Sequence, residues 1–130
     1  NKFVAGFIGS PPMNFVTGKI VQAEGLRFVA PPINLPIPEA WRPKLLPYTG
    51  KSVILGIRPE DVQHSTDGFQ STIKLIEPLG HETLLYLDVG PHNIVARVAP
   101  HHAYRIGDSI TIKFNPTRLH FFDLTTENRI

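Results

Sequence analysis

The sequence predicts an all-β domain that folds as an antiparallel barrel or sandwich. Short segments alternate apolar and polar residues or are rich in β-branched and aromatic residues, as strands are. Glycine and proline separate most of these segments, a pattern typical of antiparallel barrels and sandwiches. The chain has 130 residues, which is the size of one domain and enough for a hydrophobic core.

The first regular segment is helical. Apolar residues of FVAGFI (3–8) fall at helical spacing, and the following GSPP (9–12) stops the pattern, as a C-cap glycine followed by prolines does. We therefore expect a helix stub at residues 2–8. Because the chain begins with Asn1 rather than methionine, we expect residues 1–12 to link a domain at 13–130 to another part of a longer protein.

Strands are expected along the rest of the chain. The segments with strand periodicity or composition are 15–23, 26–30, 53–58, 70–77, 83–89, 94–98, 110–114 and 119–123. Six prolines fall within residues 31–47, too many for an ordinary helix or a central strand. We expect an extended loop there, with room for a short edge strand at residues 33–37.

The letters GKS at residues 50–52 also occur at the end of phosphate-binding loops. Such a loop requires another glycine five residues before its Gly-Lys pair, and a helix after it whose amides hold the phosphates. Here Leu45 stands at the glycine position, and residues 53–58 alternate as a strand does before Pro59. GKS is therefore predicted to be a turn that begins a strand.

A comparison within the chain supports the turn interpretation. GKSVILGIRPEDV (50–62) and GDSITIKFNPTRL (107–119) share their glycine, serine, proline and apolar positions, whereas the lysine corresponds to an aspartate. The similarity indicates a repeated β unit in which Leu55 and Ile112 are equivalent inward positions. The outward neighbours are then Ile54 and Thr111.

Composition and local pattern exclude several functions. The net charge is only +2, without a concentrated basic surface, so we expect no nucleic-acid partner. The absence of cysteine excludes disulfides and thiolate nucleophiles. Neighbouring residues of an extended chain point to opposite faces, so we expect His101 and His102 not to share a metal ion, and the adjacent carboxylates of Glu60 and Asp61 to diverge. We therefore predict no metal, no cofactor and no catalytic residue in this chain.

One hairpin is a candidate binding surface. IEPLGHETLLYL (76–87) is predicted to end a strand at Glu77, turn, and begin another at residue 82 or 83, and binding residues often lie on such rims. The alternative is that Glu77 and Glu82 are only solvated and that Gly80 only supplies a positive φ. In the nearby turn, Glu60 is expected to accept a turn amide or to pair with Arg58. The candidate interface residues are Arg58, Glu60, Glu77, Gly80, His81 and Glu82.

Several stretches together resemble one protein family. They are FVAGFIGSPPMNF (3–15), LGIRPEDV (55–62), IEPLGHETLLYL (76–87), ARV (96–98) and LHFFD (119–123). The family is the C-terminal regulatory part of the ATPase subunit of sugar importers of the maltose and glycerol-3-phosphate class. The resemblance implies an OB-fold-like antiparallel β-barrel of the transport-associated OB (TOBE) type.

The resemblance also implies a function. It suggests a non-catalytic domain that holds two ATPase subunits together as a homodimer and that regulatory proteins bind. ATP and Mg²⁺ would bind only the absent ATPase domain, which contacts permease subunits at the cytoplasmic face of the cell membrane. The alternative function is a sensor of a small oxyanion or sugar. Its anion would lie near Arg58, Arg97 and the turn amides at Gly80 and Gly107.

This chain is expected neither to bind nor to hydrolyse ATP, because it lacks the first P-loop glycine and has a strand after GKS. Calorimetric titration with Mg-ATP should give no saturable heat. Saturable binding that Lys51→Ala abolishes would contradict this expectation.

Overall fold

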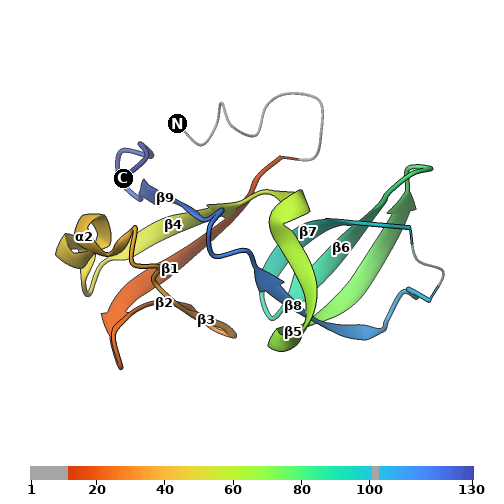
Figure 1. Cartoon of the computed structure of the whole chain (residues 1–130), viewed down its shortest axis with the longest axis horizontal. Helices are drawn as coiled ribbons and strands as arrows, with labels where there is room; N and C mark the ends of the chain where they lie inside the picture. The colour runs from red at the N-terminus through yellow and green to blue at the C-terminus, as the bar shows by residue number, and fades with distance from the viewer. Residues whose placement is uncertain (1–11, 101–102) are drawn as a thin grey trace.

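The computed structural model describes residues 12–100 and 103–130, and within them nine strands form two antiparallel sheets (Figure 1). The strand order is β3-β2-β1-β4-β9 in one sheet and β7-β6-β5-β8 in the other. The strands are β1 (Asn14–Gln22), β2 (Leu26–Ala30), β3 (Ile33–Pro36), β4 (Ser52–Ile57), β5 (Val62–Pro78), β6 (Thr83–Val89), β7 (His92–Val98), β8 (Ser109–Phe114) and β9 (His120–Asp123). The helix expected at 2–8, and His101 and His102, lie outside the described residues. No helix in the described ranges is long and apolar enough to cross a membrane.

The predicted strands are present, and β5 differs most from its predicted range. It begins at Val62 instead of residue 70, and its pairing with β8 shifts register between His64 and Phe69. Gly68 lies at this irregularity, where a Cβ atom would stand 2.1 Å from the Ile112 carbonyl oxygen. Only glycine permits so close an approach of two backbones. The polar residues before Gly68 lack strand alternation, which is why the sequence did not predict this part of β5.

The proline-rich connection is more ordered than expected. β3 confirms the short edge strand, but the rest of the connection contains the helix α2 (Arg42–Leu45) and the 3₁₀ turn η1 (Leu46–Tyr48) instead of an extended loop. Prolines occupy the first turn of both elements, where a helix needs no backbone N–H donor. Leu45 is fully buried, and the Trp41 ring packs edge-on against Phe121 at 5.0 Å. These two side chains anchor the segment to the core.

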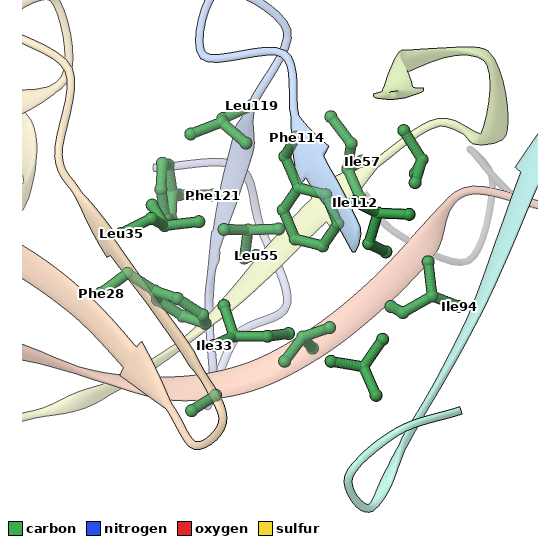
Figure 2. Close-up of a cluster of buried hydrophobic side chains, with 14 of the residues drawn as sticks. Phe28, Ile33, Leu35, Leu55, Ile57, Ile94, Ile112, Phe114, Leu119 and Phe121 are labelled. Atoms are coloured by element: carbon green, nitrogen blue, oxygen red, sulfur yellow. The ribbon is translucent and has the colours of Figure 1, made fainter. Parts of the chain in front are cut away.

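Both sheets contribute to one hydrophobic core (Figure 2). Side chains of β2, β3, β4 and β9 meet side chains of β7 and β8 in this cluster. The residues that show this in Figure 2 are Phe28, Ile33, Leu35, Leu55, Phe121, Ile94, Ile112 and Phe114. The shared core makes the two sheets the two sides of one domain.

The internal repeat predicted the inward positions correctly and one outward position wrongly. Leu55 and Ile112 are 0% and 1% exposed in the shared core. Ile54 is also buried, at 2% exposure, because the opposite face of β4 carries a second small cluster with Met13 and Phe122. The sequence of a strand that is covered on both faces is a continuous apolar run, and β4, with the sequence SVILGI, is such a strand.

The side chain of Asn14 joins the two sheets. Its Nδ2 donates to the Val95 carbonyl oxygen at 2.9 Å and to the Ile57 carbonyl oxygen at 3.1 Å, and its Oδ1 accepts from the Val95 amide at 2.7 Å. β7 is an edge strand, and this amide satisfies the backbone of Val95 as a neighbouring strand would. Asn14 is only 6% exposed, so few water molecules can replace these bonds.

Truncating either inward residue of the repeat should destabilise the domain. Leu55→Ala and Ile112→Ala are each expected to lower the free energy of unfolding by about 2 to 5 kcal/mol, as buried large-to-small changes do. Thr111→Ala, at a half-buried polar site, should cost clearly less, and Ile54→Ala should resemble the two core variants. Urea denaturation measures all four, and equal losses at Thr111 and Ile112 would show that the faces of β8 are misassigned.

Removing the Asn14 amide should also destabilise the domain. Asn14→Ala removes the acceptor of the Val95 amide and a donor to two carbonyl oxygens, and we expect a loss of about 1 to 3 kcal/mol, the cost of leaving a buried group unsatisfied. Asn93→Ala, at an exposed position on β7, is the matched control. If urea denaturation gives the same midpoint for both variants, Asn14 does not join the sheets in solution.

Candidate regulatory surface

The predicted hairpin is present between β5 and β6. β5 ends at Pro78, β6 begins at Thr83, and the Leu79 amide donates to the Glu82 carbonyl oxygen at 2.8 Å, which closes the turn. Gly80 has φ +87°, and a Cβ atom there would meet nothing within 4 Å. Gly80 is therefore explained by its backbone conformation alone.

Side chains that point away from the core form the outer face of β5, β6 and β7. Alternation on β6 turns Leu85 and Leu87 inward, so Leu84 and Tyr86 lie outside. Leu84 nevertheless is buried, between its cross-strand neighbours Glu77 and Arg97. The residues that we call the outer face are Leu75, Glu77, Glu82, Leu84, Tyr86, Val95 and Arg97.

The carboxylates of the outer face have partners. The Tyr86 hydroxyl donates to Glu77 Oε1 at 2.9 Å, and this bond is the main reason that the pKa of Tyr86 is raised. Arg97 Nη1 lies 3.2 Å from Glu82 Oε1, and both side chains are about three-quarters buried. His81 Nε2 lies 3.6 Å from the same oxygen. Glu82 is therefore part of a cross-strand ion pair instead of being only solvated.

The centre of the outer face is apolar. A shallow hollow there is lined by Lys74, Leu75, Tyr86, Leu87, Asp88, Asn93, Ile94 and Val95. Leu75 is 51% exposed beside this hollow. Lys74 and Asp88 belong to the lining of the hollow, and Glu77, Glu82 and Arg97 lie on its hairpin side, so an apolar centre adjoins charged groups. Protein interfaces have this arrangement.

The Arg58–Glu60 turn lies apart from the hairpin. It contains the 3₁₀ turn η2 (Pro59–Asp61), which packs against β7 and is closed by a 2.9 Å bond from the Asp61 amide to the Arg58 carbonyl oxygen. The Arg58 guanidinium faces His120 of β9, in the sheet that does not contain the hairpin, with Nη1 3.5 Å from Nε2. Across residues 12–100 and 103–130, no hydrogen bond or ion pair joins the Glu60 side chain to Arg58 or to a turn amide, and none joins this turn to the hairpin. The candidate residues therefore form two separate groups.

The groups considered for an anion are not gathered into one site. Arg97 is paired with Glu82, and the Gly107 amide already donates to the Ile73 carbonyl oxygen at 2.8 Å. In the described part of the chain, no group of three His, Asp or Glu side chains could hold a metal ion.

The sequence did not reveal a set of basic residues around Arg58. Arg118 and His120 are two positions apart at the start of β9, and Arg129 returns to the same place through the turn at 124–128. The closeness of Arg118 and His120 in the sequence was a visible signal, although Arg118 lies in the bend before β9 and not in the strand. The position of Arg129 had no such signal, since it depends on the turn.

The GKS stretch is a turn that begins a strand, as predicted. The Gly50 amide donates to the Ile20 carbonyl oxygen at 2.7 Å and the Lys51 amide to the Tyr48 carbonyl oxygen at 2.8 Å. β4 begins at Ser52. A phosphate cradle requires free amide donors, and here both amides already have acceptors.

Two antiparallel sheets of nine described strands around a shared core, with an apolar-centred outer face, define a small β domain of the OB type. A family model for the TOBE domain matches residues 55–122, which is more than half of the chain. A model described as the MalK OB fold domain matches residues 9–62. The chain belongs to the TOBE domain family, and the resemblance found in the sequence is confirmed.

Curated relatives match over nearly the whole chain. The oligosaccharide import ATP-binding protein MsmX of Bacillus subtilis (strain 168) is 37% identical over 140 residues, covering 100% of this chain and 38% of the relative. The multiple sugar-binding transport ATP-binding protein MsmK of Streptococcus mutans (strain ATCC 700610 / UA159) is 37% identical, with 100% and 37% covered. The ABC transporter ATP-binding protein YcjV of Escherichia coli (strain K12) is 40% identical, with 98% and 36% covered. The chain spans little more than a third of the length of these relatives.

A solved structure confirms the fold class. The cytoplasmic molybdate-binding protein ModG superposes with a TM-score of 0.67 over 83% of this chain and 94% of that chain, at 15% identity. At this identity the likeness concerns the fold alone.

Proposed function

We propose that this chain is the non-catalytic C-terminal dimerisation and regulatory domain of the ATP-binding subunit of an ABC carbohydrate importer. Membership in the TOBE family supports this function, as do the relatives whose names include import of oligosaccharides and multiple sugars. In this proposal residues 1–12 connect the domain at 13–130 to an ATPase domain that binds ATP and Mg²⁺ and contacts the permease subunits. The complex lies at the cytoplasmic face of the cell membrane.

The outer face of β5, β6 and β7 is the observation that carries the dimerisation role. It offers an exposed Leu75 and an apolar hollow next to charged residues, which we call its rim. The charges are of both signs, since Lys74 lines the hollow and Arg97 pairs with Glu82. A two-fold interface must be complementary to itself, and a patch of mixed charge satisfies this condition better than a patch of one sign. The partner proposed for this face is therefore a second copy of the chain.

The remaining candidate residues are proposed to serve regulation. Gly80 and His81 stand exposed at the tip of the hairpin, and Arg58 and Glu60 are exposed at the start of η2. Exposed loop positions on a rigid scaffold are common sites of recognition. A regulatory protein that binds the tip would contact the dimer at its edge.

Reversing one rim charge should weaken the dimer without unfolding the domain. Glu77→Lys is expected to weaken self-association by about tenfold through like-charge contacts, with a nearly unchanged melting temperature. Glu82→Lys should also weaken it, but with some loss of melting temperature, because it removes the partner of the largely buried Arg97. Leu75→Asp tests the apolar centre of the same face. Sedimentation at several concentrations and ATPase assays in the complete importer measure these effects.

The matched control is Glu39→Lys. It makes the same change of charge at an exposed residue in the connection between β3 and β4, outside the outer face. It should leave self-association and regulation of the importer as in the wild type. Wild-type dimerisation and regulation in Glu77→Lys, Glu82→Lys and Leu75→Asp together would eliminate the outer face as the proposed interface.

A further inference from the structure

The guanidinium groups of Arg58 and Arg129 face one imidazole, that of His120, and Arg118 is close enough for its charge to act on the same ring. Arg58 follows β4, Arg118 precedes β9, and Arg129 lies in the segment that folds back beside β9. A bridge between Phe122 and Arg129 fixes the folded-back segment. Residues far apart in sequence are thus held together by strand pairing.

The donors of this cluster outnumber its acceptors. His120 faces Arg58 Nη1 with Nε2, at 3.5 Å, and Arg129 Nη1 with Nδ1. A guanidinium group only donates, and a neutral imidazole has one acceptor nitrogen. In either tautomer, one of the two arginines therefore faces an N–H group instead of a lone pair. Within the described chain the Arg118 side chain has no hydrogen bond or ion pair.

Burial and the surrounding charges favour the neutral form of His120. The pKa of His120 is lowered, first by burial and then by Arg129, Arg58 and Arg118. The nearby carboxylate of Asp61 has a raised pKa, first from burial and then from Glu60, although Arg118 and Arg58 act in the opposite direction. In the described residues, no ion pair within 4.0 Å links the carboxylate of Asp61 or of Glu60 to these arginines. The nearby acids therefore do not occupy these guanidinium donors, which are exposed to solvent.

We propose that Arg58, Arg118, Arg129 and His120 bind a phosphate group. Arginine is suited to phosphate because its planar donors can bond two oxygens at once. Three guanidiniums that approach from different elements match the several oxygens of a tetrahedral oxyanion better than the two oxygens of one carboxylate. The ring of Trp41 lies 5.2 Å from the Arg129 guanidinium and limits its freedom by a cation–π contact.

The phosphate group could belong to the free ion or to a phosphorylated organic molecule, since both present the same oxygens. The site lies in the sheet that contains β4 and β9, whereas the outer face lies in the other sheet. Phosphate binding here is therefore independent of the proposed dimerisation. Loss of either property in a variant would leave the other measurable.

NMR of the His120 imidazole tests the proposal directly. The 130-residue chain, labelled with ¹⁵N, is titrated with potassium phosphate while potassium chloride keeps the ionic strength constant. We expect saturable shifts of His120 and no comparable shifts of His92, whose Nε2 lies 3.1 Å from the Ala30 carbonyl oxygen in another region. Bound phosphate should also raise the pKa of His120, because a nearby negative charge favours the protonated ring.

Variants separate a built site from general charge attraction. Arg118→Gln and Arg129→Gln should each weaken phosphate binding about tenfold, the effect of losing one charge-assisted hydrogen bond. Arg105→Gln, an equal charge change at an exposed residue before β8, should leave the affinity unchanged. All three positions are exposed, so the variants should fold, and melting temperatures check this.

The outcomes are distinct. Absence of saturable shifts, equal weakening by Arg105→Gln, or equally tight binding of acetate would overturn the proposal. If phenyl phosphate binds at least as tightly as inorganic phosphate, the ligand class is a phosphorylated molecule. If only inorganic phosphate binds, the ligand is the free ion.

Discussion

The hydrogen bonds of the Asn14 side chain are the constraint on which the arrangement of this domain depends. The two sheets share an apolar core, but apolar packing is non-directional and does not fix how one sheet lies on the other. Asn14 bonds both backbone groups of Val95 and the carbonyl oxygen of Ile57. One buried amide thereby fixes β7 against β1 and β4. The inward direction of Ile94 and the outward direction of Arg97 follow from that position.

The same constraint separates the two surfaces of interest. With β7 fixed by its open edge, the sheet of β5, β6 and β7 must turn its outer face away from the first sheet. Leu75 and the Glu82–Arg97 pair therefore lie on one side, and the cluster at His120 lies on the other sheet. Arg58 follows β4 directly, and η2 packs on β7, so this turn stands where the sheets meet. The candidate residues of the sequence divided into two groups for this reason.

The parts of the fold that sequence predicted are those controlled by local periodicity. Alternation in short segments predicted the strands, and the repeat predicted the inward sites of Leu55 and Ile112. The burial of Ile54 was not predicted, because periodicity cannot show that a second cluster covers the far face of β4. The helix α2 was predicted to be a loop because of its prolines, since the sequence does not distinguish prolines in the first turn of a helix from prolines in a loop. Of the candidate sites, the hairpin was predictable, whereas Arg129 depends on a bridge to β9.

The accounting of donors and acceptors distinguishes a chance motif from a candidate site. At GKS the amides of Gly50 and Lys51 already donate to the carbonyl oxygens of Ile20 and Tyr48, so these two amides are not available to bind a phosphate. Around His120 no motif exists, yet guanidinium donors exceed the acceptors that face them. These arginines are exposed, so water meets their donors, and a ligand with several negative oxygens replaces that water with charge-assisted hydrogen bonds. Because the satisfaction of a donor depends on residues brought together by the fold, a site of this kind emerges from the three-dimensional arrangement instead of from adjacent letters.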